Sequence, residues 1–504
     1  MKICIVGAGF GGLAAAAMLG KNGHNVTVFE KNEGPGGRAG IYTEKGYTFD
    51  MGPSWYLMPD VYETFFAALG TAPEEHFNLV LLDPAYRIFF EDRRIVDISS
   101  DPEKTIALFD TFEEGGGSRL RDYLQSAAEM YEVSKDLIYR DYRTIFDVFD
   151  RKLVLEGTKM HALESLDSFV GRYFYSDEAK KVVEYSIGFL GGSPKNTPAF
   201  YHIMSHIDLT LGVWYPQGGI RQVVDAIHDI AWKSGVIFRY DEPVEEILVE
   251  GDTAIGVRTT KATFGADLVI VNADYAHAEL DLLPHEGRTY PRHYWEKRVM
   301  APSAFVAYLG VSGEIPELAH HNLFLERDRA EGLDHIFDTG RPAWPEHPSY
   351  YVNVPSKTDT TAAPEGCETL FVMVPLAPGL EDSPERREAF LERILDDLEA
   401  KIGRPIREQV EVKRIFALSD FTRRYNAYRG TALGLTQTLW QTALFRPAYR
   451  SRHVKNLYFT GQYTHPGIGV PMTLISSQIV DREIRTDMGR EEELRDRQTA
   501  VPHL

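Results

Sequence analysis

The sequence has little cysteine and little positive charge. Its two cysteines, Cys4 and Cys367, stand far apart among 504 residues, which argues against a disulfide framework and a cysteine-based zinc site. The formal net charge is −20, from 54 basic and 74 acidic side chains, and this disfavours binding to nucleic acid or to an anionic bilayer through charge alone. We therefore expect a cytoplasmic chain that binds no nucleic acid and contacts any membrane mainly through apolar side chains.

The sequence also lacks repeats, low-complexity runs and a good transmembrane span. Residues 456–480 carry no acidic or basic group apart from His465, but two prolines, two glutamines and several hydroxyls make a poor bilayer helix. Residues 3–20 are uncharged, as in an export signal, yet four glycines interrupt them and a β-branched strand pattern follows. An export signal is therefore disfavoured, and the length predicts two or more packed units.

Glycines follow a short apolar run at the start of the chain. Lys2–Val6 is typical of a buried parallel strand, Gly7-x-Gly9-x-x-Gly12 comes next, and a helix is expected over Leu13–Lys21. The first glycine permits a tight turn, the second lets the backbone approach a diphosphate, and the third lets helix pack on strand. The helix N-terminus would then point its amides at the phosphates. A dinucleotide site is favoured over an ordinary glycine-rich turn.

The residues that follow indicate which dinucleotide binds. Glu30 ends the second expected strand, where a carboxylate can accept hydrogen bonds from both ribose hydroxyls. A second glycine-rich loop, Gly34–Gly40, contains Arg38, whose guanidinium can reach a diphosphate. A nicotinamide-binding unit ordinarily lacks such a loop, so we expect FAD rather than NAD. A surface turn with a solvated arginine is the alternative.

Three further segments extend this pattern to the C-terminus. They are Gly212–Gly219 (GVWYPQGG), Asn272–Asp274 (NAD) and Gly461–Pro471 (GQYTHPGIGVP). Together with the glycine loop, they resemble the bacterial-type phytoene desaturase family, the FAD-dependent carotenoid desaturases among the amine-oxidase-like flavoproteins. Leu318–Asn322 and Ala363–Gly366 add weaker matches. The resemblance therefore covers almost the whole chain.

The resemblance implies an α/β fold with a Rossmann-like FAD-binding domain built from discontinuous segments and an inserted α+β substrate domain, an amine-oxidase-like architecture. The FAD-binding domain is expected over residues 1–83, 216–299 and 419–488. The substrate domain, which would face the membrane, is expected over residues 84–215 and 300–418. Residues 489–504 form a charged tail, and the chain is expected to fray after Arg485.

Within these segments the hydrophobic pattern predicts particular elements. We expect helices over 220–233 and 384–402, and strands or hairpins over 86–98, 236–240, 244–260, 268–271, 304–311, 369–374 and 457–460. In related flavoproteins, a valine at the start of such a hairpin holds the adenine ring with backbone groups. Val244 and Ile247 are both expected on the adenine side, and the resemblance carries the backbone role to Val244. Otherwise both residues are strand core.

The C-terminal motif is expected to contact the flavin. A strand ending at Thr460 would deliver Gly461 to the carboxyl edge of the sheet, where cofactors bind in open α/β sheets. A helix opening near Gly469 and Val470 would then stabilise negative charge on the reduced flavin. Many related flavoproteins place an aspartate after the glycine, whereas Gln462 stands here, so a ribityl contact from this residue is left open. The predicted cofactor-binding residues are Gly7, Gly9, Gly12, Glu30, Arg38, Val244, Gly461, Gly469 and Val470.

No catalytic residue and no metal site are assigned. His465 lies beside prolines in a tight motif, so we expect a structural hydrogen-bond partner rather than a base. His320 and His321 are expected to point to opposite faces of a strand, which argues against a metal pair. Apolar residues at helical spacing over 138–149 predict an amphipathic face that either packs into the core or lies on a membrane.

The resemblance implies FAD-dependent desaturation of a long polyisoprenoid such as phytoene or a carotenoid intermediate, with hydride transfer to flavin N5. It also implies a quinone or oxygen as electron acceptor, and peripheral attachment to the cell membrane through an apolar mouth. A carotenoid or retinoid isomerase or saturase and a flavin amine oxidase are alternatives on the same fold. A non-catalytic flavin-binding scaffold is the alternative of another class.

Overall fold

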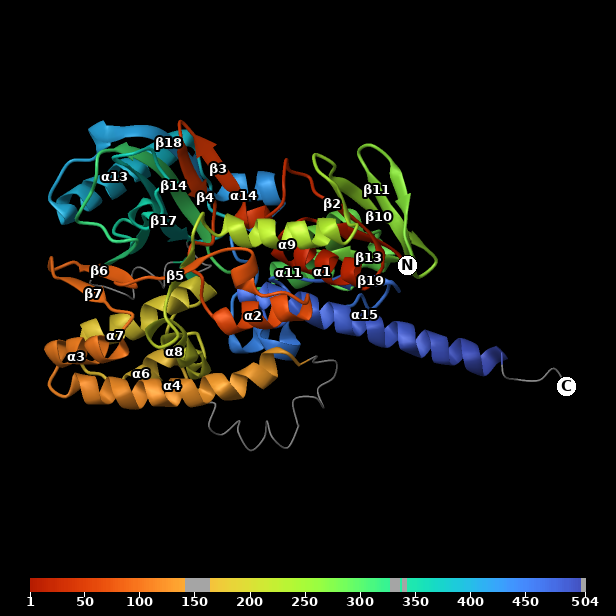
Figure 1. Ribbon diagram of the computed structural model, residues 1–504, viewed down its shortest axis with the longest axis horizontal. Coiled ribbons are helices and arrows are strands. Elements are labelled where there is room, and N and C mark those ends of the chain that lie inside the picture. Colours follow the sequence, from red (N-terminus) through yellow and green to blue (C-terminus); the bar gives the residue numbers. More distant parts are fainter. Residues whose placement is uncertain (141–163, 327–335, 338–341, 500–504) are drawn as a thin grey trace.

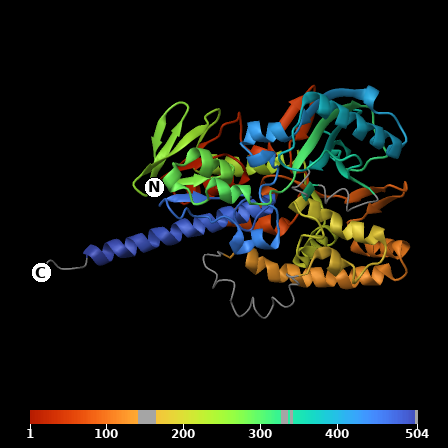
Figure 2. The same ribbon diagram turned by 180° about the vertical axis from the view of Figure 1, so that it is seen from behind.

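A five-stranded parallel sheet takes its strands from the beginning, middle and end of the chain. The computed structural model describes residues 1–140, 164–326, 336–337 and 342–499, and Figures 1 and 2 view it from opposite sides. The sheet order is β19 (Leu457–Phe459), β13 (Leu268–Val271), β1 (Lys2–Val6), β2 (Asn25–Phe29) and β9 (Ile237–Arg239). All four neighbouring pairs are parallel. The N-terminal strand and the C-terminal motif are therefore separated by one strand only.

Helices cover this sheet and join the chain ends. α1 (Phe10–Lys21) connects β1 to β2 and packs against α9 (Arg221–Lys233) and α15 (Val470–Thr499), as Figure 1 shows. Residues 10–20 of α1 are all buried, which explains why this helix is alanine-rich and apolar all round. The Ser477 hydroxyl on α15 donates to the Gly11 carbonyl at 2.8 Å. The short helices α10 (Tyr275–His277) and α11 (Arg292–Glu296) follow β13.

A three-stranded antiparallel sheet extends this part of the molecule. Its strands are β10 (Val244–Glu250), β11 (Thr253–Thr259) and β12 (Thr263–Gly265). Ile247 and Val257 are fully buried and share an apolar cluster with residues of β1 and β13. The hairpin predicted over 244–260 therefore packs on the parallel sheet.

A seven-stranded sheet forms the second large part, at the upper left of Figure 1. Its order is β18 (Val410–Phe416), β14 (Ser303–Ser312), β17 (Cys367–Leu376), β16 (Tyr350–Asn353), β15 (His321–Leu325), β6 (Tyr86–Phe90) and β7 (Ile95–Ile98). Every pair is antiparallel except β15 with β6. Side chains alternate between two apolar clusters, as a period of two requires. One face packs against α13 (Pro384–Ile402), and the other belongs to the cluster that includes α1.

Helices gather at the lower left of Figure 1, in orange and yellow. They are α3 (Pro102–Phe112), α4 (Gly116–Ile138), α6 (Leu166–Val170), α7 (Asp177–Glu184) and α8 (Ile203–Leu209). Asp101, Ser165 and Ser176 cap α3, α6 and α7 through side-chain oxygens, which satisfies amides that a helix start leaves unpaired. The remaining elements are β3 (Ile41–Glu44) with β4 (Tyr47–Asp50), β5 (Leu79–Leu81) with β8 (Trp214–Pro216), and the helices α2 (Pro59–Ala68) and α14 (Leu418–Tyr425).

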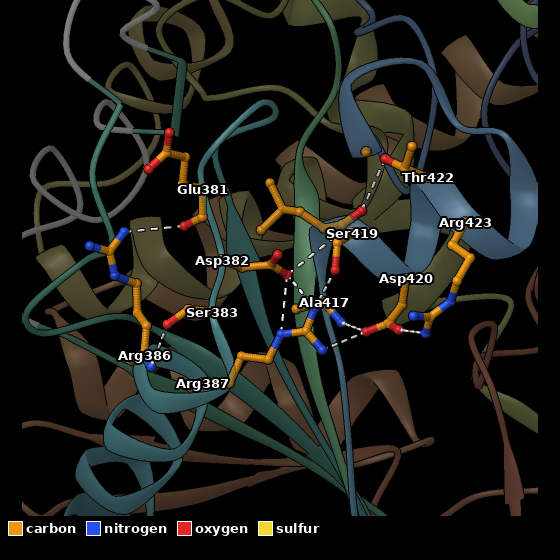
Figure 3. Close-up of polar contacts among 12 residues, drawn as sticks. Glu381, Asp382, Ser383, Arg386, Arg387, Ala417, Ser419, Asp420, Thr422 and Arg423 are labelled. Atoms are coloured by element: carbon orange, nitrogen blue, oxygen red, sulfur yellow. Dashed lines mark hydrogen bonds and ion pairs between the residues drawn. The ribbon is translucent and has the colours of Figure 1, made fainter.

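An ion-pair network ties α13 to α14 (Figure 3). Arg387 donates from Nη1 to Asp420 Oδ2 at 2.7 Å and from Nη2 to the Ser419 hydroxyl at 2.7 Å. Asp382 pairs with the same guanidinium and accepts the Ser419 amide at 3.2 Å. Both carboxylates are nearly buried. Loss of Arg387 would leave Asp382 without an ion-pair partner among the described residues, whereas Asp420 would keep Arg423.

The predicted α/β class is confirmed, with a parallel sheet assembled from separated segments. The expected strands and helices form within three residues of their predicted limits, and several match them. The prediction that the chain frays after Arg485 is wrong, because α15 continues to Thr499. The face predicted over 138–149 lies mostly outside the described residues, and the limits of the two domains stay a prediction.

Candidate functional site: a cofactor and substrate cavity

One cavity of about 960 Å³ runs between the two large sheets. All of the predicted cofactor residues except Gly12 line it. Gly12 has a packing role instead, since a Cβ there would lie 2.0 Å from the Gly7 carbonyl oxygen. The sequence-predicted residues are therefore brought together at one end of one cavity.

Asn272 joins the glycine loop to the C-terminal strand. A Cβ at Gly9 would lie 2.9 Å from Asn272 Oδ1, and a Cβ at Gly461 would lie 2.7 Å from Asn272 Nδ2. The Nδ2 group donates to the Thr460 carbonyl at 3.1 Å. These close approaches explain why the tripeptide at 272–274 accompanies the two glycine motifs.

Glu30 lies at the end of β2 with its carboxylate held in place. Oε2 accepts the Ala8 amide at 2.9 Å and Oε1 accepts the Asn32 amide at 2.9 Å. The side chain is 5% exposed and lines the cavity. Oε1 also accepts the Asn32 side-chain amide at 2.7 Å, so the lone pair left for a ribose hydroxyl is on Oε2.

Arg38 brings buried hydrogen-bond donors to the cavity. Its guanidinium lies 5.4 Å from the centre of the Tyr425 ring, and its Nε and Nη2 are buried without a hydrogen-bond partner among the described residues. Such donors are costly to bury unless an acceptor meets them. Gln462 also lines the cavity, and its Nε2 is likewise buried without a hydrogen-bond partner among the described residues. An anionic, oxygen-rich group such as the FAD diphosphate and ribityl chain would satisfy both residues.

Val244 begins β10 and lines the cavity, whereas Ile247 is fully buried in the core of the sheet. The positions of Val244 and Ile247 therefore differ, although the sequence left both the adenine-side role and the strand-core role open for each residue. The adenine contact of Val244 stays a prediction.

The C-terminal motif, Gly461–Pro471, forms a turn that lines the same end of the cavity as the glycine loop. Gly461, Gly467 and Gly469 have φ of +115°, +126° and +120°, a region that favours glycine. α15 begins at Val470, and its first residues line the cavity. The positive end of this helix dipole therefore faces the cavity, as predicted for a site that accepts negative charge.

Arg446 holds this turn from behind. The buried guanidinium donates to the carbonyls of Tyr463 and Thr464 at 3.1 Å and to Gln437 Oε1 at 3.1 Å. Burial without a carboxylate lowers the pKa of Arg446 to about 10. No motif in the sequence marked this residue, because its acceptors are backbone carbonyls brought together by the fold.

Gly218 and Gly219 lie where three segments of the chain meet: the start of α9, the end of β4 and the residues around Asp359. Asp50 accepts the amides of Ile220 at 2.8 Å and Arg221 at 3.2 Å, and a Cβ at Gly219 would lie 2.5 Å from its Oδ2. Asp359 accepts the Gly218 amide and the Tyr215 hydroxyl. The YPQGG stretch therefore connects the start of α9 to β4 and to the segment between β16 and β17, and it does not itself line the cavity.

The histidines differ partly from expectation. His465 lines the cavity, and its carbonyl accepts the Tyr449 hydroxyl at 2.9 Å. The prediction that His320 and His321 point to opposite faces of a strand is wrong, since their ring centres lie 4.5 Å apart. β15 begins only at His321, so the alternation does not include His320. No cluster of metal-ligating side chains occurs within the described part of the chain.

Lys181, Glu184 and Glu326 also line the cavity, but most of the remaining lining is made of apolar side chains. They come from α8, from β14, β15 and β17, and from the loop over residues 432–445, and include Ile207, Val306, Leu323, Phe371, Met373 and Leu439. On β17, Phe371, Met373 and Pro375 line the cavity while Leu370, Val372 and Val374 pack toward α13. The cavity is therefore polar at the glycine loops and apolar along the second sheet.

An exposed aromatic pair lies next to the cavity lining. Trp440 is 68% and Phe445 is 41% exposed, with ring centres 5.4 Å apart. Leu439, Leu444 and Phe445 line the cavity. Among the described residues, no helix is both long and apolar enough to span a bilayer.

Known proteins resemble the chain over nearly its whole length. It is 44% identical to the carotenoid 3,4-desaturase of Haloarcula japonica, covering 94% of this chain and 96% of the relative. It is 36% identical to the zeta-carotene-forming phytoene desaturase of Myxococcus xanthus, over 96% and 94% of the two chains. An oxidoreductase structure from Methanosarcina mazei aligns with a TM-score of 0.61 at 19% identity, over 96% of this chain and all of that one, which shows the fold.

The sequence profile described as flavin containing amine oxidoreductase matches residues 10–483. This match confirms the FAD cofactor and the oxidoreductase class expected from the motifs. The chain belongs to the family of flavin-containing amine oxidoreductases.

Proposed function

We propose that the chain is an FAD-dependent carotenoid desaturase, which removes hydrogen from a long polyisoprenoid such as phytoene or a carotenoid intermediate. One observation carries the proposal: the predicted cofactor residues and a long apolar wall line the same cavity. The similarity to two named carotenoid desaturases over more than nine-tenths of the chain supports the substrate class.

The protein's own residues would bind the cofactor, orient it toward the substrate and keep water out of the cavity. Asn272, Gly9 and Gly461 shape the diphosphate cradle, and Glu30 and Arg38 hold the ends of the dinucleotide. When bound, FAD supplies an acceptor for the hydride removed from the substrate. The positive end of α15 and the Arg446 charge behind it favour that acceptance by stabilising negative charge.

Product analysis tests this function. The purified holoprotein is incubated with phytoene and with partly desaturated carotenoids in vesicles, and products are separated by chromatography with absorbance detection. Desaturation lengthens the polyene and shifts its absorbance to longer wavelength, whereas isomerisation keeps the number of double bonds and saturation lowers it. Turnover of putrescine or another amine with no change in any polyene would favour an amine oxidase and contradict the proposal.

We also propose that the enzyme lies on the membrane with the pair Trp440 and Phe445 at the surface of the bilayer. An exposed aromatic pair beside the apolar lining suits the entry of a water-insoluble substrate. Since the net charge is −20, attachment would be apolar, and vesicle binding should not weaken as salt concentration rises. The electron acceptor would be a quinone or oxygen.

Trp440→Glu should weaken this attachment. We expect binding to neutral vesicles in a flotation assay to fall by about tenfold, because a charge replaces an interfacial aromatic ring. Trp232→Glu is the matched control, since Trp232 is 64% exposed on α9 and does not line the cavity. Equal losses in the two variants would contradict the proposed orientation.

A further inference from the structure

A chain of hydrogen-bonded side chains leads from the cavity wall into the protein. Ser54 Oγ lies 2.9 Å from Tyr351 Oη, which lies 2.7 Å from His321 Nδ1. Ser54 and Tyr351 line the cavity, while His321 is fully buried behind them. The three residues come from the loop after β4, from β16 and from β15. Neither the cofactor site nor the sequence motifs account for this chain.

The loop that carries Ser54 is fixed to the cofactor loop. The Met51 amide donates to the Gly40 carbonyl at 2.9 Å, and Met51 O accepts the Tyr308 hydroxyl at 2.9 Å. A Cβ at Gly52 would lie 2.6 Å from the Arg38 carbonyl oxygen. Ser54 therefore belongs to the cavity segment that adjoins the predicted flavin residues.

The neighbours of His321 define the direction of the hydrogen bonds. Asn353 Nδ2 donates to the His320 carbonyl at 3.1 Å, which identifies it as the amide nitrogen, and it lies 3.3 Å from His321 Nδ1. Facing a donor, Nδ1 is the unprotonated, accepting nitrogen. The Tyr351 hydroxyl therefore donates to Nδ1 and accepts from Ser54. Ser54 Oγ keeps a lone pair for the cavity.

The surroundings keep this imidazole neutral at rest. Its ring stacks on Trp55 with centres 4.4 Å apart and planes at 11°. Nε2 has no hydrogen-bond partner among the described residues. Burial, together with neighbouring His320, holds the pKa of His321 well below its usual value. A neutral acceptor is thus present at the inner end of the chain.

Resting on the proposed desaturase function, we propose that Ser54 accepts the proton that desaturation releases and that Tyr351 and His321 carry its charge away from the cavity. Removal of a hydride leaves a substrate carbon short of two electrons. In the same step the C–H bond of the adjacent carbon breaks, its electron pair forms the new double bond, and its proton goes to Ser54 Oγ, so that flavin reduction depends on proton uptake. Ser54 passes its own proton to Tyr351, and Tyr351 passes its own to His321 Nδ1.

The step balances in atoms, electrons and charge. The hydride carries one proton and two electrons from the substrate to the flavin. The second proton ends on His321. Because a proton next to an electron-deficient carbon is strongly acidic, a neutral hydroxyl and imidazole suffice as acceptors. The proton returns along the same chain when a quinone or oxygen takes up two electrons and two protons from the enzyme.

Three variants test the relay. Tyr351→Phe removes the middle hydroxyl, and Ser54→Ala removes the first proton acceptor. His321→Asn places a neutral amide, which cannot take up a proton, where Nδ1 stands in the wild type. Tyr47→Phe is the matched control, since its buried hydroxyl bonds Glu411 outside the cavity. Flavin reduction is followed by anaerobic stopped flow with the polyene that bleaches the wild-type flavin fastest, in H2O and in D2O. FAD content and dithionite reduction of each variant are measured in parallel.

We expect flavin reduction to be about a hundredfold slower in Ser54→Ala and Tyr351→Phe, and slower in His321→Asn, with full FAD content and normal dithionite reduction. Wild type and the control should react more slowly in D2O, because the relay protons exchange with solvent, and Tyr351→Phe should lose that difference. Wild-type rates in Ser54→Ala and Tyr351→Phe, or an unchanged D2O effect in Tyr351→Phe, would refute the relay alone. Failure of every polyene to bleach the wild-type flavin would refute the proposed function and the relay with it.

Discussion

The two large sheets form the cavity in different ways. The five-stranded parallel sheet presents the carboxyl ends of its strands, so that Val6, Phe29, Asn272 and Thr460 line the cavity together with the loops that follow them. The seven-stranded sheet presents a face, and alternate residues of β17 reach the cavity. The proposed cofactor contacts therefore depend on backbone shape at a few loops, whereas the proposed substrate contacts depend on side chains spread along strands.

Gly9→Val should break the parallel-sheet end of the cavity. A Cβ there would lie 2.9 Å from Asn272 Oδ1, and the larger side chain would fill the space where a diphosphate approaches. We expect FAD content, measured by absorbance after purification, to fall to less than about a tenth of wild type, equivalent to at least ~1.4 kcal/mol of binding.

Gly34→Val is the matched control for this change. Gly34 lies in the second glycine loop without a positive φ, and a Cβ at this position would have no neighbouring atom within 4 Å. The variant should keep its FAD. Equal cofactor loss in both variants would show general loop disruption, and full FAD content in Gly9→Val would mean that the cradle is misplaced.

Met373→Trp should affect the other end of the cavity. Met373 lines the cavity from β17, so a larger ring takes space from an elongated substrate. We expect polyene turnover to fall by about tenfold or more while FAD content stays at the wild-type level. Loss of FAD together with turnover would contradict the separation of the two ends.

The opposite face of the same strand gives the control. Leu370 is fully buried on the face of β17 that packs toward α13. Leu370→Ala should lower the free energy of unfolding by roughly 2–5 kcal/mol. The folded fraction should retain FAD and form the wild-type product.

Two buried carboxylates, Glu30 at the end of β2 and Asp208 on α8, differ in their hydrogen-bond partners. Glu30 accepts backbone amides, whereas Asp208 accepts the hydroxyls of Tyr185 at 2.7 Å and Tyr86 at 3.3 Å. Burial raises the pKa of Asp208 from 3.8 to about 7. The protonated form is thus favoured on folding, and its contribution to stability is present below about pH 4 and is lost as pH rises through 7.

Asp208→Asn should remove this pH dependence. Between pH 4 and pH 8, wild type should lose stability relative to the variant by an amount on the order of a few kcal/mol. Urea unfolding at both pH values measures the difference. A constant difference across this range would show that Asp208 titrates normally in the folded protein.

Glu30→Gln should have the smallest effect. The amide keeps one acceptor oxygen near the Ala8 amide but loses the charge that strengthens hydrogen bonds from ribose hydroxyls. We expect FAD to bind about three- to tenfold more weakly, a cost of ~1 kcal/mol, as measured by titration of the apoprotein. A loss as large as that of Gly9→Val would mean that Glu30 shapes the loop as well.

The difference between the sheets explains what the sequence predicted. The glycines, Glu30 and the C-terminal motif are contiguous signals with a fixed geometric meaning, and they meet at one end of the cavity. The hydrophobic pattern likewise predicted the strands β14 and β17 and the helix α13 nearly to their limits. Both depend on residues that are close in sequence.

Other features depend on residues that are far apart. Arg446 is stabilised by carbonyls of a distant turn, and Ser54, Tyr351 and His321 come from three separate segments. No local pattern marks Arg446, Ser54 or Tyr351, and the weak match over Leu318–Asn322 that contains His321 gave it no such role. The expectation for His320 and His321 failed because it assumed that both lie within one strand, whereas β15 begins between them.

The most direct test of the account is whether a polyene in the apolar part of the cavity reaches the flavin at the other end. The holoprotein is titrated anaerobically with phytoene and with longer-conjugated carotenoids in vesicles, and flavin absorbance and products are recorded together. Our account predicts that the flavin bleaches as one new double bond forms per flavin. A fully loaded flavin that stays oxidised with every polyene would contradict it.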